Sequence, residues 1–253
     1  MLGLHWQAIT EINNYDGKII YKDGREEIIP YGIEEIEEKA YFENKEIVSV
    51  VLPNSVKRIG TGAFCACAEL ESIDMPDSIL KIENHAFSEC EKLKNVKLSK
   101  NIEIIPYCAF YNCFELKTID IPSEVKIIEP YAFALYIPDS YALDISSLRM
   151  STAYHGLSEP KTASQLKGLS GEITIPEGVE KIDGDAFYNC FRLKSAKIPK
   201  SLISINNFPA QIDIYYNGKS KDWHFVEGRL HVRSKVHFKT LFGYTKSYLQ
   251  IKT

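Results

Sequence analysis

Six cysteines and six histidines are the side chains of this chain best suited to metal binding or nucleophilic chemistry. Cys67, Cys90 and Cys113 are 23 residues apart, and Cys190 has the same local neighbours. A cysteine that recurs at one repeat position is typical of a small buried apolar residue. Disulfides and a metal site are the alternatives, although the pair Cys65 and Cys67 does not have zinc-finger spacing. We therefore expect buried thiols.

The histidines are scattered along the chain. His231 and His237 lie on one face of a predicted strand, where a metal pair would lack a third ligand, and a solvated polar face is the simpler interpretation. The chain has no phosphate-binding loop, no dinucleotide fingerprint, no zinc-protease motif and no nucleophile elbow. The sequence thus predicts a non-enzymatic protein without a catalytic, cofactor or metal site.

Length and charge narrow the class of protein further. The chain has 253 residues and a net charge of −4, which disfavours nucleic acid and anionic membranes as partners. It has no apolar run of the length that a transmembrane helix needs. Residues 1–7 have neither a basic region nor a long apolar stretch, so no signal peptide is expected, which favours the cytoplasm.

The most informative pattern is a set of positions that recur every 23 residues. The aromatic position is occupied in turn by Tyr41, Phe64, Phe87, Phe110 and Phe133. The isoleucine position is occupied by Ile36, Ile59, Ile82, Ile105 and Ile128. The proline position is occupied by Pro30, Pro53, Pro76 and Pro122, with Ser99 once in its place. Several registers locked to one period predict a solenoid, in which each coil buries its apolar face against the next coil.

Each repeat also predicts local elements. The segment from Leu70 to Met75 ends in an alternating pattern typical of a short strand, and residues 93–98 and 116–121 repeat it. Pro76 follows the first of these segments, and proline ends a ladder because it donates no hydrogen bond. We expect one such strand in each coil, an aromatic column in the core and cysteine in a narrow corner.

The pattern A-F-x-x-C-x-x-L-x-x-I-x-x-P-x-x-V-x-x-I resembles the BspA-like type of leucine-rich repeat. Residues 63–82, 86–105, 109–128 and 186–205 spell it, and the resemblance spans roughly residues 24–215. It implies a leucine-rich-repeat solenoid, a right-handed, β-rich α/β superhelix with a parallel sheet on its concave face. It also implies protein binding or adhesion, in a secreted or cell-surface protein.

The repeat is interrupted between Phe133 and Phe187. These residues are 54 positions apart, which the sequence suggests is two periods plus eight residues. Residues 141–146 then supply a strand, and Ala153 with Tyr154 forms a displaced Ala-Phe pair. An insertion at about 147–170 follows as a loop on the rim, either tolerated without a role or used for binding.

The ends of the chain differ from the coils. We expect a lead-in or cap at 1–23, the solenoid at 24–228 and a basic strand or cap at 229–253. Trp223 is expected to close the open end of the core, with a ligand site as the alternative. Residues 229–239 alternate apolar and basic or histidine side chains, which predicts a strand or hairpin with one cationic face. The candidate basic patch comprises Arg229, Arg233, Lys235 and Lys239.

Opposite charges gather at the two ends. Residues 23–46 hold nine acidic and three basic residues, whereas residues 228–253 hold six basic residues and no acidic one. The ends could therefore join head to tail into an assembly. Contact of the short basic segment with nucleic acid or another anion is a weaker alternative.

The solvent-facing positions of the predicted sheet form a second candidate site. They are Asp74, Lys97, Asp120, Asp144, Thr174 and Lys197. Strands about 4.8 Å apart place such side chains in one ladder. This ladder either keeps an open sheet in solution or offers a mixed-charge face to a protein partner, and we expect the chain to be an interaction scaffold that uses this face or the rim loop.

Overall fold

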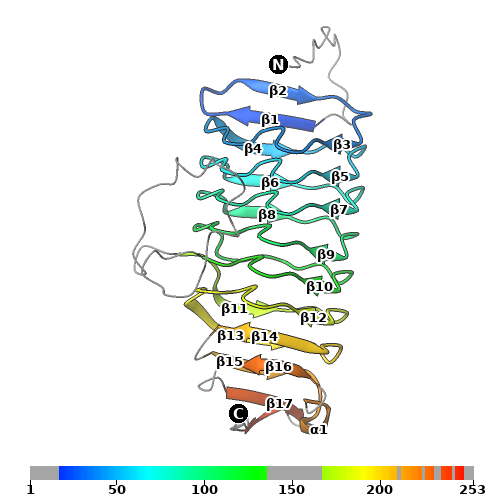
Figure 1. Ribbon diagram of the computed structural model, residues 1–253, viewed down its shortest axis with the longest axis vertical. Coiled ribbons are helices and arrows are strands. Elements are labelled where there is room, and N and C mark those ends of the chain that lie inside the picture. The colour runs from blue at the N-terminus through cyan, green and yellow to red at the C-terminus, as the bar shows by residue number, and fades with distance from the viewer. Residues whose placement is uncertain are drawn as a thin grey trace.

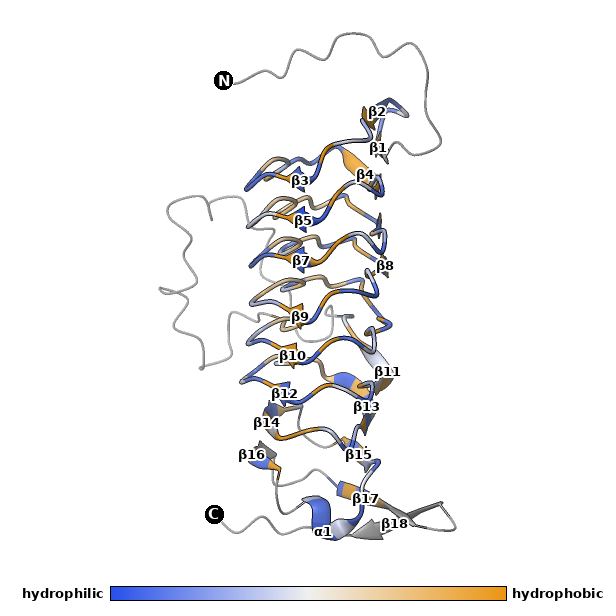
Figure 2. Ribbon diagram, turned by 90° about the vertical axis from the view of Figure 1, so that its right-hand side faces the viewer, coloured by the Kyte–Doolittle hydropathy of each residue, from blue (hydrophilic) through white to orange (hydrophobic). Residues whose placement is uncertain are grey.

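The chain forms a column of stacked coils in a computed structural model, which describes residues 17–135, 167–209, 212–223, 226–230, 235–240 and 243–247 (Figure 1). Apolar and polar positions recur at the same place in successive coils (Figure 2). The predicted β-solenoid with parallel strands is confirmed. The only helix in the described ranges is α1 (Ser220–Trp223), so the structure is built almost wholly of strands and turns.

Each coil has three sides, two of which carry strands. The first, called here the strand face, carries the sheet β2 (Glu26–Ile29), β1 (Gly17–Tyr21), β4 (Ile47–Val51), β6 (Ser72–Asp74), β8 (Asn95–Lys97), in this order. Further along the column it carries β11 (Ser170–Thr174), β13 (Arg192–Ile198), β15 (Asp213–Tyr216), β17 (Lys235–Thr240), β18 (Gly243–Ser247).

The second side, called here the isoleucine side, carries mostly two-residue strands. Its first sheet contains β3 (Glu35–Ile36), β5 (Arg58–Ile59), β7 (Lys81–Ile82). Its second sheet contains β9 (Ile104–Ile105), β10 (Ile127–Ile128), β12 (Lys181–Ile182), β14 (Ser204–Phe208), β16 (Glu227–Leu230). Ile36 pairs with Ile59 and Ile59 with Ile82 in parallel register, so one isoleucine per coil points into the core.

The third side, the Ala-Phe side, consists of tight turns and holds the aromatic column. The rings of Phe64, Phe87, Phe110 and Phe133 stack with centroids 5.4–5.5 Å apart and interplanar angles of 4–7°. The turns need left-handed backbone at recurring places, such as His85 (φ 58°) and Glu89 (φ 61°). Such conformations are costly for residues other than glycine, and the backbone hydrogen bonds between neighbouring turns offset that cost.

The cysteines are free thiols and all six are buried, so disulfides are excluded and the predicted buried-thiol role is confirmed. Cys67, Cys90 and Cys113 stand in one column, where each thiol donates to a carbonyl oxygen of the preceding coil at 3.1–3.3 Å. Burial raises the pKa of Cys67 to about 12, and that of Cys90 and Cys113 well above its usual value. These sulfurs therefore stay protonated and act as core atoms, since the nucleophile is the thiolate.

The interpretation of the 54-residue gap as two periods plus eight residues is wrong. Phe133 stacks directly on Phe187 with ring centroids 5.3 Å apart, and Ile128 pairs directly with Ile182. The two rings therefore belong to neighbouring coils, although 54 positions separate them in the sequence. The strand expected at 141–146 and the pair Ala153 and Tyr154 lie outside the described residues, as does most of the expected rim insertion.

Antiparallel hairpins close the strand face at both ends. β1 pairs antiparallel with β2 and with β4, and β17 pairs antiparallel with β18. The expected boundary at residue 23 falls in the turn between β1 and β2. Beyond residue 228, β17 extends the parallel sheet from β15. Trp223, which precedes this segment, is buried and packs edge to face on Tyr216, with ring centroids 4.9 Å apart. This placement supports the expected role of Trp223 in closing the core.

A candidate partner-binding face

The strand face carries two ladders of solvent-facing side chains, because alternate residues of a strand point to opposite sides. Buried Val50 and Ile73 point inward, and the residues on either side of them point outward. The first ladder, called here the polar ladder, consists of Ser49, Ser72, Asn95 and Thr118, which are spaced 23 residues apart. The second, called here the charged ladder, consists of Asp74, Lys97 and Asp120.

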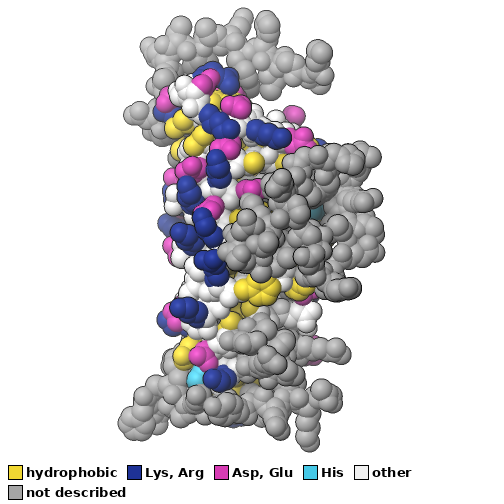
Figure 3. Space-filling view, turned by 90° about the vertical axis from the view of Figure 1, so that its left-hand side faces the viewer, with side chains coloured by type: hydrophobic (Ala, Val, Ile, Leu, Met, Phe, Trp, Pro, Cys, Tyr) yellow, Lys and Arg dark blue, Asp and Glu magenta, His cyan; other side chains and the backbone are white. Residues whose placement is uncertain are grey.

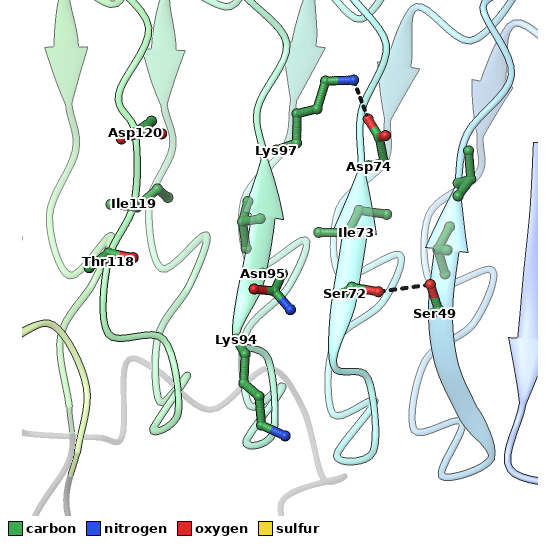
Figure 4. Close-up of a pocket in the computed structure, with 13 residues that line it drawn as sticks. Ser49, Ser72, Ile73, Asp74, Lys94, Asn95, Lys97, Thr118, Ile119 and Asp120 are labelled. Carbon is green, nitrogen blue, oxygen red and sulfur yellow. Dashed lines mark hydrogen bonds and ion pairs between the residues drawn. The ribbon is translucent and has the colours of Figure 1, made fainter.

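The two ladders line a hollow with a volume of about 340 Å³ (Figure 4). Short side chains of the polar ladder form its floor, and the hydroxyl oxygens of Ser49 and Ser72 are hydrogen-bonded at 2.7 Å. The charged ladder and Lys94 also line the hollow, and Lys94 and Lys97 have the longest side chains of the lining. The lining thus combines short polar side chains with charged ones.

Ion pairs at the margins join successive coils. Lys97 contacts Asp74 at 2.7 Å, and Lys94 contacts Glu71 at 3.2 Å. The Lys97 and Asp74 side chains are 65% and 45% exposed, so water screens the pair and its contribution to stability is small. Figure 3 shows basic side chains interspersed with acidic ones in a line along the column.

The six predicted face residues are distributed along the column. Asp74, Lys97 and Asp120 meet at the hollow, as their spacing predicted. Thr174 and Lys197 pair with each other further along the same side, and the Lys197 amine contacts Glu172 at 2.6 Å. Asp144 lies outside the described residues. A role for these residues in binding stays a prediction.

Sequence analysis missed the polar ladder. Ser49, Ser72, Asn95 and Thr118 keep the 23-residue period as regularly as the core residues do. Their spacing is a sufficient signal for such a ladder. Because these residues are uncharged, a search for charged positions finds the neighbouring register of Asp74, Lys97 and Asp120 instead. A hollow also depends on side-chain length across several strands, which a single register does not reveal.

Residues 229–239, expected as a strand or hairpin with one cationic face, are divided between two strands of different sheets. Arg229 belongs to β16 on the isoleucine side, whereas Lys235 and Lys239 belong to β17 on the strand face. β16 and β17 belong to different sheets, so Arg229 and Lys235 do not lie on one strand. Arg233 lies outside the described residues.

His237 is also not on the solvated face that was expected. Its ring is buried, stacks on Tyr215 with centroids 4.7 Å apart, and is hydrogen-bonded to Asp213 at 3.1 Å. The proposed metal partner His231 lies outside the described residues. The described ranges contain no cluster of three or more metal-ligating side chains, and no helix in them is long and apolar enough to cross a bilayer.

One buried polar cluster lies on the Ala-Phe side. Asn112 donates to the carboxylate of buried Glu89 at 2.8 Å, across neighbouring coils. His85 Nδ1 and Ser88 Oγ are buried without a hydrogen-bond partner in the described part of the chain. Burial lowers the pKa of His85 to about 4, so the ring is neutral near pH 7.

Comparison with known proteins agrees with this architecture. The family model described as "BspA type Leucine rich repeat region" matches residues 22–136 and 165–209 in six copies. No sequence of a curated protein matches the chain.

Several solved structures of leucine-rich repeat proteins are also similar. A T. pallidum leucine-rich repeat protein is 22% identical over 63% of this chain and 62% of its own, with a TM-score of 0.46. A leucine-rich cell surface protein of Faecalibacterium prausnitzii is 24% identical over 84% and 41%, with a TM-score of 0.40. A Bacteroides ovatus protein is 19% identical over 82% and 67%, with a TM-score of 0.46. The chain thus spans less than two thirds of the first two proteins. With its column of 23-residue coils and a family match over more than half its length, the chain belongs to the BspA-type leucine-rich repeat family.

Proposed function

We propose that this chain is a non-enzymatic scaffold that binds a protein partner through the strand face, at the hollow formed by the polar and charged ladders. The observation that carries the proposal is the hollow itself, which has hydrogen-bonding floor residues and opposite charges at its margins. A repeat scaffold presents such a surface rigidly, because each coil is held by its neighbours.

The lining of the hollow favours a protein over a carbohydrate. None of its residues is aromatic, so it offers no flat ring on which a sugar could stack. Lys94, Lys97, Asp74 and Asp120 present both signs of charge within one short stretch of surface. A protein segment with complementary acidic and basic groups matches this pattern, and complementary charges set specificity and association rate.

The test begins with capture and identification of a partner by the intact chain, followed by affinity measurements on the purified pair. Reversal of Asp74, Lys97 and Asp120 together (D74K, K97E, D120K) is expected to weaken binding at least about tenfold, or about 1.4 kcal/mol. The control is Lys57→Glu, which breaks an exposed ion pair with Glu34 on the isoleucine side and is expected to leave affinity unchanged.

Deletion of residues 151–166 separates the face from the rim loop. We expect this deletion to preserve affinity if the hollow alone binds, and to reduce it if the rim segment contributes contacts. The proposal fails if both the triple reversal and the deletion leave affinity at the level of the unmodified chain.

Head-to-tail assembly is a second candidate, supported by the placement of the charged segments. The acidic residues 23–46 lie toward one end of the column, and β17, which carries Lys235 and Lys239, lies toward the other (Figure 1). Contact between unlike ends of successive copies extends into a filament instead of closing. We infer that the copies associate at low ionic strength through these ends, and that the contact adds to partner binding on the strand face.

Salt is the decisive variable for this candidate. Exposed charges are screened over about 10 Å at 0.1 M salt and about 3 Å at 1 M. Light scattering is therefore expected to show assemblies at about 0.01 M salt that dissociate by about 0.5 M. A monomer of constant mass across this range would contradict head-to-tail assembly.

A further inference from the structure

Both strand-bearing sides are interrupted at the same step of the solenoid. On the isoleucine side one sheet ends at β7 and the next begins at β9, although Ile82 and Ile105 are one period apart. On the strand face β8 is the last strand of its sheet, and residues 118–120, one period further on, form no strand (Figure 4). The interruption on the isoleucine side falls between coil 76–98 and coil 99–121, a boundary called here the seam. The strand face is interrupted at the same boundary, and its next sheet begins only at β11. The strand predicted at residues 116–121 is therefore not formed.

Proline at one register explains the interruption on the isoleucine side. Elsewhere the residue at this register donates its N–H to the isoleucine carbonyl of the preceding coil, at 2.8–2.9 Å. The donors are Gly60, Glu83, Glu129 and Asp183. The residue at the seam is Pro106, which has no N–H to donate.

A second bond of the same ladder is missing at the seam. Leu80 donates its N–H to the Lys57 carbonyl at 2.8 Å, and Lys126 donates to the Glu103 carbonyl at 2.7 Å. Within the described part of the chain no such bond runs from Glu103 to Leu80. Among the described residues, two backbone hydrogen bonds of this ladder are therefore missing at the seam, the one at Pro106 and the one at Glu103.

The strand face has lost the equivalent bonds. Leu52 donates to the Asp74 carbonyl at 3.1 Å, and Met75 donates to the Lys97 carbonyl at 3.0 Å. The next bond in this series, from Leu98 to Asp120, is absent among the described backbone hydrogen bonds. The hollow takes its lining from both sides of this opening, with Asn95 and Lys97 on one coil and Thr118 and Asp120 on the next.

The Ala-Phe side, in contrast, remains closed across the seam. His85, Phe87 and Glu89 donate their N–H groups to carbonyls of the next coil at 2.7–3.0 Å. The Phe87 and Phe110 rings stack at 5.5 Å, and the Asn112 amide donates to Glu89 at 2.8 Å. The corner between the strand face and the isoleucine side is also joined, since Ser99 Oγ donates to the Ile79 carbonyl and the Asn101 side-chain amide to the Asp77 carbonyl, both at 2.6 Å. The Ala-Phe side therefore keeps its backbone ladder across the seam, whereas the backbone ladders of both strand-bearing sides are interrupted.

We infer that the seam is a hinge built into the solenoid, at which the strand-bearing sides open about the Ala-Phe side. Stacked repeats unfold together only when the interfaces between neighbours couple them, so a weak interface divides the column into separately opening blocks. The blocks here are the coils before residue 99 and those after it. The seam is independent of partner binding, since it follows from backbone hydrogen bonds alone.

Hydrogen exchange measured on the intact chain tests the hinge. Buried amides of β4 and β6 report the first block, and those of β12 and β14 report the second. Protection is expected to differ between the blocks by about tenfold or more, which corresponds to independent opening. Pro106→Glu restores the donor found at this register in neighbouring coils, and is expected to bring the two blocks within about threefold of each other.

The converse variant creates a seam elsewhere. Asp183→Pro removes the N–H that bonds to Ile128 at 2.8 Å, and is expected to separate the protection of β10 from that of β12. Asp183→Ala is its matched control, because it removes the same partly buried carboxylate, which pairs with Lys181, but keeps the N–H. A common opening of both blocks in the unmodified chain would overturn the hinge. The hinge would also be overturned if the Asp183→Pro and Asp183→Ala variants showed the same hydrogen-exchange protection and Pro106→Glu left the protection of both blocks unchanged.

Discussion

Replacement of Phe110 by alanine is expected to lower the free energy of unfolding by about 3–5 kcal/mol. The Phe110 ring is 1% exposed and stacks on a ring on each side at 5.5 Å. Its removal leaves a cavity in the middle of the column and takes away a stacking contact from both neighbours. The loss falls on the Ala-Phe side, where the seam is held closed.

Chemical denaturation measures this effect, with free energies summed over all transitions. Phe191→Ala is the matched control, because the same ring is 63% exposed there and its loss is expected to cost less than about 0.5 kcal/mol. Equal losses in the two variants would show that the aromatic column does not carry the stability assigned to it.

A loss of stability between about pH 6.5 and pH 4 is the second large effect we expect, and His85 is its source. Burial lowers the pKa of His85 from 6.5 to about 4, so on acidification the unfolded chain takes up a proton before the folded chain does. The contribution is therefore fully present above pH 6.5 and is lost as the pH falls toward 4. A shift of about 2.5 units corresponds to roughly 3 kcal/mol.

The variant His85→Asn isolates this contribution. Asparagine does not titrate and tolerates the left-handed backbone at this position, where φ is 58°. Denaturant midpoints at pH 7 and pH 4.5 are expected to converge in the variant and to differ in the unmodified chain. Carboxylates act on both proteins alike, so an equal pH dependence in the two would refute the role of His85.

The fold could be predicted from sequence because the period is recorded independently by several residue types. Phe64, Cys67 and Leu70 each recur one coil later, as Phe87, Cys90 and Leu93, and all six residues are buried. Periodicity places equivalent residues on top of one another whatever the fine geometry of the coil. It therefore predicted the core, the free thiols and the charged ladder.

The interruptions could not be predicted in the same way. The distance from Phe133 to Phe187 suggests two periods plus eight residues, because a count of residues does not reveal how many of them belong to a coil. The sequence also does not reveal that residues 229–239 are divided between β16 and β17 of different sheets, since an alternating pattern does not show where one strand ends and the next begins. Pro106 was visible, but its effect depends on which neighbouring carbonyl its missing N–H would have met.

The ion pairs between coils also bear on how the chain finds its own register. All coils share one core pattern, so apolar packing alone would allow a coil to stack on the next but one. Glu69 contacts Lys92 at 2.5 Å, and Lys97 contacts Asp74 at 2.7 Å. A misfolded chain that skipped one coil would instead place Glu69 against Glu115, and Asp74 against Asp120. Surface charges that add little to the stability of the native column thus penalise the commonest error open to a repetitive chain.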